Sequence, residues 1–320
     1  MKNFFAFTMA EILLSLTIIG VVAAITLPSL TGNINERTWN TQRKALYARM
    51  SQAISLMPAL NGYGTLDDTT DTATETFITA GLSKVLKINN ICDSEHLKDC
   101  GLPDKITRID GASIINLADI KTLHNYNTLF KRAGGQGGNY SQKDTTAAAF
   151  ETANGESILV YYNPRCVGKM DGKVATRADG RTFTYYYSQG RMCANFVYDL
   201  NGNKGPNTVG KDIGVITALY PSDSVVVSPV PFVKDNLGRA QTFAIALRAC
   251  RELDADSRLP NLEEDMSMIY NKFLFNTNSG SAPYMSSTLN KDAKPMTVAA
   301  DTGEVYEDYG VWPGVRCVKR

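Results

Sequence analysis

The sequence predicts an α+β fold with a long N-terminal helix, an antiparallel sheet packed on that helix, and a second, C-terminal α+β domain. The segment from Phe7 to Leu27 is almost continuously apolar and has the length of a helix that crosses a membrane. From Ser157 onward, Asp-Gly and Gln-Gly turns separate runs that contain Tyr and Val, which is typical of antiparallel strands. The predicted strands of this sheet are Ser157–Tyr162, Arg181–Tyr187 and Met192–Tyr198. Beyond the proline-containing segment 220–235, helical periodicity returns at 241–253 and from 262 onward. Asn261, with Glu264 three residues later, predicts a capping box at the start of the second of these helices.

One charged residue, Glu11, lies inside the apolar segment. A carboxylate in such a helix is unfavourable by roughly 2.5–3.5 kcal/mol on insertion scales, so it requires a partner or a function. A secretory signal would have a shorter apolar core followed by a small-residue cleavage site. A plain membrane anchor leaves Glu11 unexplained, unless its side chain reaches the interface.

The polar segment after Pro28 continues as an amphipathic helix. Its apolar residues are spaced as one helical face requires: Trp39, Leu46, Met50, Ile54 and Met57. The pattern predicts one long, gently kinked helix that ends before Pro58, with its second half packed on a globular domain.

The sequence AFTMAEILLSLTIIGVVAAITLP resembles the cleavage and methylation motif of type IV prepilins and type II secretion pseudopilins. The resemblance implies cleavage between Ala6 and Phe7 by a prepilin peptidase, methylation of the new amine, and a leader of residues 1–6. Glu11 would neutralise the amine of a neighbouring subunit during assembly, and Pro28 matches a helix-kinking proline. The family usually has Gly where this chain has Ala6.

The same resemblance implies a location and partners. The unassembled subunit would be a single-pass protein of the inner, cytoplasmic membrane, with a cytoplasmic N-terminus and an extracytoplasmic head. It would then enter a cell-surface or periplasmic filament. Its partners would be other pilin subunits, bound through the N-terminal helix, together with prepilin peptidase and an inner-membrane assembly platform. The predicted parts are the helix 7–57, a pilin-like domain 58–225 and a further domain 236–320.

The segment from Asp199 to Asp212 begins with the pattern Asp-x-Asn-x-Asn, like the start of a calcium loop whose alternate oxygens face one centre. Calcium is the cofactor that this pattern suggests. Its candidate ligands are Asp199, Asn201, Asn203 and Asp212. Lys204 and Gly210 occupy the sixth and twelfth positions, where calcium loops of the EF-hand type have glycine and an acid. The alternative is a tight Asn/Gly turn capped by its own side chains.

Six cysteines are present, and all follow residue 90. Their even number suggests disulfides formed in an oxidising compartment; buried thiols are the alternative. Cys92 and Cys100 bracket a short polar loop and are predicted to form a local bridge. Cys166 and Cys193 flank the predicted hairpin region and form a second candidate pair.

The C-terminal part combines a helix containing Cys250, the tripeptide Arg258-Leu-Pro, the pattern Tyr-x-Ser-Ser-Thr from Tyr284 and a closing Val-Arg-Cys-Val. These features resemble bacterial domains of the C-type-lectin-like superfamily, which occur in adhesins. The resemblance implies a bridge between Cys250 and Cys317. The sugar-binding signatures of calcium-dependent lectins are absent from 240–320, so a lectin-like fold does not by itself imply sugar binding.

These features predict a minor pilin or pseudopilin of a type IV pilus or type II secretion-type filament, in low copy number or at the tip. The alternative is an adhesin displayed by the filament, whose C-terminal part binds a glycan or protein ligand. A net charge of +1 without a basic stripe argues against nucleic acid. An enzyme is not expected, because the sequence offers only His96 and His124 and no reactive cysteine pair.

Overall fold

The structure is a computed structural model. It describes residues 9–60, 72–126, 145–164, 172–176, 180, 182–186, 192–219, 225–232, 237–275, 283–300, 303–307 and 312–319. The chain divides into two compact units, Met1–Leu46 and Tyr47–Arg320.

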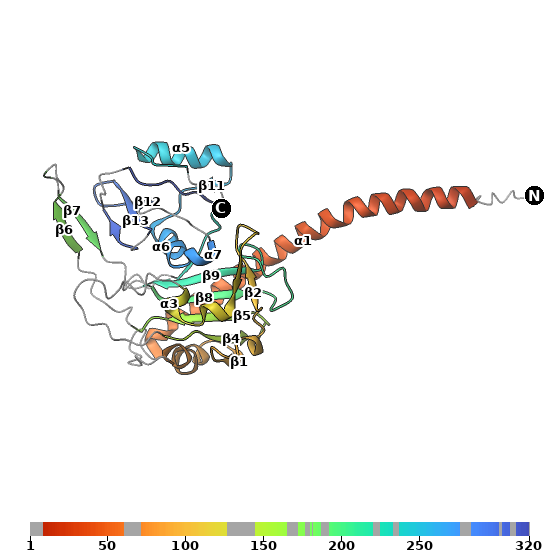
Figure 1. Ribbon diagram of the computed structural model, residues 1–320, viewed down its shortest axis with the longest axis horizontal. Coiled ribbons are helices and arrows are strands. Elements are labelled where there is room, and N and C mark those ends of the chain that lie inside the picture. The colour runs from red at the N-terminus through yellow and green to blue at the C-terminus, as the bar shows by residue number, and fades with distance from the viewer. Residues whose placement is uncertain are drawn as a thin grey trace, which may run out of the picture. The chain divides into compact units, whose positions relative to one another are not determined.

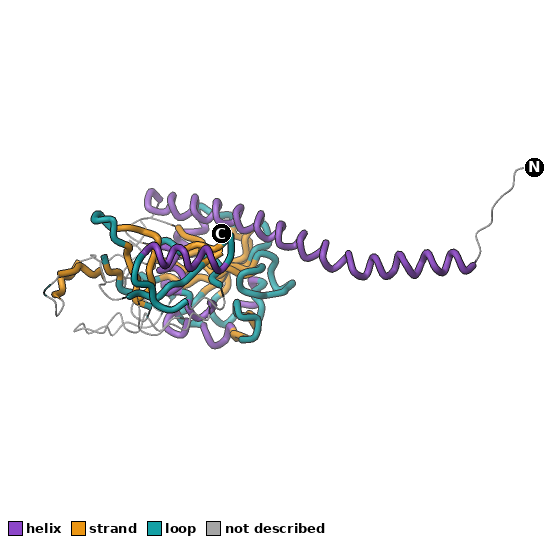
Figure 2. The backbone as a smooth tube through the Cα atoms, turned by 90° about the horizontal axis from the view of Figure 1, so that it is seen from above, coloured by secondary structure: helices purple, strands orange, loops and turns teal. Residues whose placement is uncertain are grey.

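Helix α1 extends over 52 residues, Met9–Leu60, and continues past Pro28. It ends three residues beyond the predicted boundary at 57. Met50, Ile54 and Met57 are buried, as the amphipathic pattern predicts. Within the second unit, the Tyr47 hydroxyl donates a hydrogen bond of 2.9 Å to the carbonyl of Val225, and the last turns of α1 lie along the strands (Figure 2).

The predicted fold class is wrong in its membrane part. Among the residues whose side chains are described, no helix combines the length and the apolar character needed to cross a membrane. The described apolar run of α1, from Ile12 to Val22, covers about 16 Å at about 1.5 Å per residue, against a hydrocarbon core of roughly 30 Å. This finding contradicts the prediction that the first half of the helix spans a membrane. It also contradicts the predicted single-pass location in the inner membrane.

A six-stranded antiparallel sheet forms the centre of the second unit (Figure 1). Its order is β1 (Ile88–Cys92), β4 (Ala148–Thr152), β5 (Ser157–Tyr162), β8 (Met192–Asp199), β9 (Ile213–Leu219) and β10 (Val225–Val227). Every residue of β5 and β8 is buried, because both faces of the sheet are covered. Tyr161 stacks on Tyr126 with ring centroids 4.2 Å apart, whereas Tyr162 stacks on Phe77 at 4.4 Å. Adjacent strand residues point to opposite faces, so these two contacts identify the two covering layers.

Short elements cover the sheet. The Phe77 side comprises α2 (Ala73–Thr76), η1 (Phe77–Gly81) and η2 (Leu82–Lys84). A second group comprises η3 (Leu97–Cys100), β2 (Lys105–Thr107), β3 (Ile114–Asn116), η4 (Leu117–Ile120) and α3 (Leu123–Tyr126). On the Tyr126 side, the Tyr161 hydroxyl donates a 2.7 Å hydrogen bond to the carbonyl of Ile120.

A second antiparallel sheet has the order β12 (Pro283–Leu289), β13 (Pro295–Ala299), β14 (Val305–Tyr306), β7 (Thr182–Tyr186) and β6 (Gly172–Thr176). The C-terminal elements around it are α5 (Phe243–Leu253), β11 (Ser257–Arg258), α6 (Leu262–Tyr270), α7 (Lys272–Phe275) and β15 (Val318–Lys319). In the described part of this unit beyond α1, helices are short and strands dominate. The longest of these helices, α5, has 11 residues.

The C-terminal elements share a sheet and a core with the central part of the unit Tyr47–Arg320. Strand β7 was expected beside β5 and β8, but it pairs with β14, with Tyr185 opposite Tyr306. The apolar face of α6, including Met266 and Ile269, joins one core cluster with Leu159 of β5. An amphipathic helix must bury its apolar face, and α6 does so in the core shared with the central sheet.

The start of α6 follows the predicted capping box. The Asn261 side chain accepts a 2.7 Å hydrogen bond from the backbone N–H of Glu264, and the Glu264 carboxylate accepts one of 2.9 Å from the backbone N–H of Asn261. Arg258 donates to the same carboxylate at 2.6 Å. This local chemistry fixes where the helix begins, as the sequence indicates.

Candidate calcium centre

The loop between β8 and β9 brings two aspartates to one end of a hairpin. Asp199 is the last residue of β8 and lies opposite Ile213, the first residue of β9. The backbone N–H of Leu200 donates a 3.0 Å hydrogen bond to the carbonyl of Asp212. The antiparallel pairing therefore places both carboxylates at the base of the loop.

The two aspartates are buried and differ in how their oxygens are satisfied. Asp212 is fully buried, and its carboxylate accepts hydrogen bonds from the backbone N–H groups of Asn207 at 2.8 Å and Thr208 at 2.9 Å. Asp199 is 1% exposed, and its Oδ1 accepts a bond of 3.1 Å from the backbone N–H of Asn201. The other oxygen, Oδ2, is buried without a hydrogen-bond partner.

Two amide oxygens in the same loop are also buried without a hydrogen-bond partner: Oδ1 of Asn201 and Oδ1 of Asn207. The Asn201 amide nitrogen donates a 2.8 Å hydrogen bond to the carbonyl of Gly205. The other amide atom of Asn201 is therefore the oxygen Oδ1, which can only accept a hydrogen bond. Buried acceptors normally have partners, so three orphaned oxygens in one loop require an explanation. Carboxylate and amide oxygens are the ligands that Ca²⁺ takes in proteins.

The electrostatics of the loop favour a cation. The pKa of Asp199 is raised to about 7, mainly by burial and also by the nearby carboxylate of Asp212, against the backbone hydrogen bonds that lower it. Two buried carboxylates in mutual repulsion are unfavourable unless a positive charge compensates them.

The structure brings together three of the four residues predicted as ligands: Asp199, Asn201 and Asp212. Asn203 is exposed and reaches its neighbours through its backbone N–H, which donates to the carbonyl of Gly101 at 2.9 Å. Asn207 was missed, although it occupies the ninth position of the alternating pattern, a ligand position of calcium loops. The described residues contain no cluster of three His, Cys, Asp or Glu side chains suited to a metal, so amide or backbone oxygens would have to complete the set.

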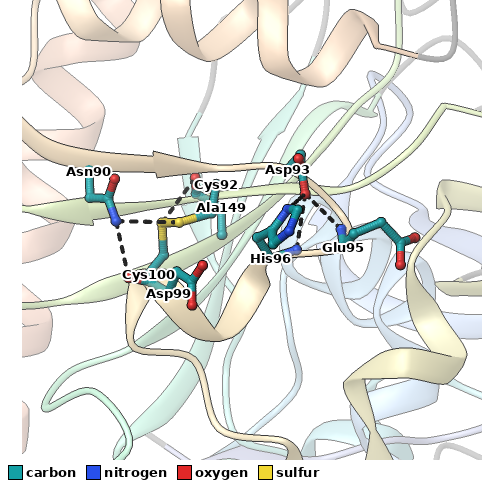
Figure 3. Close-up of a disulfide and its surroundings, with 8 residues drawn as sticks. All are labelled: Asn90, Cys92, Asp93, Glu95, His96, Asp99, Cys100 and Ala149. Atoms are coloured by element: carbon teal, nitrogen blue, oxygen red, sulfur yellow. Dashed lines mark hydrogen bonds and ion pairs between the residues drawn. A yellow bond between two sulfur atoms is a disulfide. The ribbon is translucent and has the colours of Figure 1, made fainter.

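A disulfide loop ends next to Gly101, whose carbonyl accepts the bond from Asn203, and Figure 3 shows this disulfide with its surroundings. The predicted bridge between Cys92 and Cys100 is confirmed. Within the loop, Asp93 accepts hydrogen bonds from the backbone N–H groups of Glu95 at 2.9 Å and His96 at 3.0 Å, and its carboxylate lies 2.8 Å from the His96 ring nitrogen Nδ1. The loop is thereby organised around one carboxylate.

The loop should respond to pH through this pair. The hydrogen bond to Asp93 raises the pKa of His96 from 6.5, and the same bond lowers the pKa of Asp93 from 3.8. The contribution of His96 to the stability of the loop is fully present below the pKa that His96 has in the unfolded state. It is lost as the pH rises through the pKa of His96 in the folded state. The Asp93 contribution is present above its unfolded pKa and is lost as pH falls through the folded value. The pair therefore stabilises the loop most between about pH 4 and 6.5.

An NMR titration of the imidazole resonances tests this pair. We expect Asp93→Asn to lower the apparent pKa of His96, because the charged acceptor is removed, while the His124 resonance in the same spectra stays unchanged. An unaltered His96 titration in the variant would contradict the assignment.

The remaining predicted site residues have different outcomes. The bridge between Cys250 and Cys317 is confirmed. Cys193 is disulfide-bonded, and its predicted partner Cys166 lies outside the described residues. Ala6 and Phe7 lie outside them as well. Glu11 and Pro28 belong to α1, but their side chains are not among those described.

Comparison with known proteins gives no match to a family model, to a curated protein or to a solved structure.

Proposed function

We propose that this chain is a subunit of a type IV pilin-like filament and assembles through the N-terminal part of α1. The observation that carries the proposal is the exposure of nearly every large apolar side chain of this segment, each between 46% and 64% exposed: Ile12, Leu13, Leu14, Leu16, Ile18, Ile19, Val21 and Val22. A helix that is apolar around its whole circumference is normally buried. An exposed apolar surface of this kind marks an interaction site.

Equivalent helices of neighbouring subunits are the proposed occupants. Helices of this composition pack against one another through their apolar side chains, and the prepilin-like sequence motif supports the same mode of assembly. Cleavage before Phe7 and the pairing of Glu11 with a neighbour's amine belong to this proposal. A head of residues 47–320 is large for a repeating unit, so we place the subunit at low copy number, at or near a filament tip.

Incorporation into filaments tests the proposal. We expect Ile18→Lys to abolish incorporation, because a lysine would enter the apolar contact between helices. Leu289→Lys is the matched control: Leu289 is 44% exposed in the head, and its substitution should leave incorporation unchanged. Quantitative mass spectrometry of purified filaments measures both variants and the N-terminus. Equal incorporation of Ile18→Lys, or an intact Met1, would contradict the proposal, and a dominant share of the filament would contradict low copy number.

A second proposed activity is calcium binding by the Asp199–Asp212 loop. The three buried, unpartnered oxygens of Asp199, Asn201 and Asn207 favour it over the simple Asn/Gly turn. A ligand that binds only the folded state stabilises it by about 2.7 kcal/mol at a concentration 100 times its Kd. The ion would therefore act structurally, by holding the loop.

Calorimetric titration of the protein with CaCl₂ measures this activity. We expect Asn207→Ala to weaken binding, because it deletes a ligand oxygen. Asn203→Ala is the matched control, because this neighbouring side chain is exposed and its removal should leave the affinity unchanged. Equal affinities of the two variants would contradict the assignment of ligands, and no heat of binding in the wild type would contradict the site.

A further inference from the structure

The segment between the Cys92–Cys100 disulfide and the end of β2 forms one wall of the Asp199–Asp212 loop. The carbonyl of Gly101, the residue after Cys100, accepts the hydrogen bond of 2.9 Å from the backbone N–H of Asn203. At the other end of the segment, Thr107 exchanges two backbone bonds with the loop, accepting from Val209 at 3.0 Å and donating to the carbonyl of Asn207 at 2.9 Å. The segment therefore touches the loop on both sides of its tip.

One of these bonds acts directly on a proposed ligand. Asn207 has a positive φ of 51°, a conformation that asparagine tolerates better than most residues but adopts at some cost. Its carbonyl is held by the N–H of Thr107, and its own N–H is held by Asp212. The orientation of the Asn207 side chain thus depends on β2 as well as on the loop.

The disulfide anchors the beginning of this wall. Cys92 is the last residue of β1 and pairs with Ala149 of β4, so it belongs to the central sheet. Its bond to Cys100 fixes the residue before Gly101 to that sheet. Gly101 itself has a φ of 75°, and a Cβ at this position would lie 2.6 Å from Oγ of Ser157. The wall is therefore held by a covalent bond at one end and by a close backbone approach next to it.

We propose that the Cys92–Cys100 disulfide positions the Asp199–Asp212 loop for a divalent cation, so that high calcium affinity requires the oxidised bridge. This inference rests on the proposed calcium binding, and it adds that the Cys92–Cys100 bridge controls the calcium affinity. Without the covalent anchor, the segment 101–107 gains freedom in the unliganded protein. Calcium binding must then order the segment as well as the loop, which lowers the affinity. The bridge acts on the ion only through the segment 101–107, so Cys92 and Cys100 are positioning residues.

The experiment titrates CaCl₂ into the full chain, kept monodisperse by a mild detergent, and compares Cys92→Ser/Cys100→Ser with the wild type. We expect the affinity to fall by roughly tenfold or more, the range seen when groups that orient metal ligands are removed. The control is Cys250→Ser/Cys317→Ser. This pair closes a much longer loop, with a sequence separation of 67 against 8, so its loss destabilises the fold more while leaving the wall of the loop intact.

A second pair of variants retains all disulfides. Gly101→Ala pushes a methyl group toward Ser157 and should displace the wall, again weakening calcium binding by roughly tenfold. Gly111→Ala is matched to it, because Gly111 has a similar φ of 71° but open space around its Cβ position. This pair decides the question if the cysteine variant does not fold.

The outcomes separate the two proposals. If the wild type binds no calcium, both the site and its control by the bridge are overturned. If the wild type binds calcium and neither the Cys92/Cys100 variant nor Gly101→Ala changes the affinity, the site stands and the positioning role is overturned. A loss of affinity in both of these variants, with none in Cys250/Cys317 or Gly111→Ala, is the result we expect.

Discussion

Removing the Cys250–Cys317 bridge by double substitution with alanine is expected to lower the free energy of unfolding by about 4 kcal/mol. The two cysteines are separated by 67 residues, and a closed loop of that length restricts the unfolded chain strongly. Both cysteines are fully buried in a small cluster with Ala246, Leu259 and Val315. The bridge therefore holds α5 to the C-terminal segment by a covalent bond.

Chemical denaturation of the wild type and the variant measures this loss. The comparison is the Cys92/Cys100 double alanine variant, whose separation of 8 residues predicts a smaller loss of about 2.5 kcal/mol. Equal losses in the two variants, or a larger one for the short loop, would show that native-state strain or residual structure in the unfolded chain outweighs loop closure.

Features that depend on neighbouring residues were predictable from the sequence. The capping box joins Asn261 to Glu264 within one turn, and the bridge between Cys92 and Cys100 closes a short polar loop. Strand β5 was predicted with its observed bounds because its run Ser-Ile-Leu-Val-Tyr-Tyr has strong strand character. In each case the residues that cause the structure lie close together in the chain.

Features that depend on distant partners were not predictable. The residues of β7 indicate a strand, but nothing in them selects β14 over the central sheet as the partner, because pairing is decided by the final packing. For the same reason, the sequence of α6 did not indicate that the helix shares a core with the central sheet. The bridge between Cys250 and Cys317 was expected only from a family resemblance, since six cysteines leave many pairings open.

The candidate site shows the same division. The pattern Asp-x-Asn-x-Asn pointed to Asp199 and Asn201, and hairpin geometry brings Asp212 to them. Asn203 lies in the same pattern but is exposed, because its backbone is turned to Gly101. Asn207 became a candidate only with the structure, since its position depends on Thr107 of β2, a hundred residues earlier in the chain.

A buried polar network joins α6 to the central sheet and was not expected from the sequence. Asn195 of β8 and Asn271, the residue that ends α6, exchange side-chain hydrogen bonds of 2.6 and 3.1 Å. The hydroxyl of Tyr126 donates to Asn271 and accepts from Asn195 at 3.1 Å, and Thr217 donates to Asn195 at 2.8 Å. The amide of Asn271 also donates to the carbonyl of Ser267 at 2.7 Å, within α6 itself. Because each of these residues is at most 1% exposed, water cannot replace a lost partner.

Asn271→Leu should therefore reduce the free energy of unfolding by about 3 kcal/mol, because it leaves several polar groups around it buried with fewer hydrogen bonds. Asn195→Leu should have a similar effect. The double variant is the decisive measurement: replacing both amides with apolar groups removes the mismatch between them, so its loss should fall below the sum of the single losses by about 1 kcal/mol or more. Additive losses in urea denaturation would instead mean that the two amides stabilise the fold independently. In that case the side-chain bonds between Asn195 and Asn271 would not couple α6 to the central sheet.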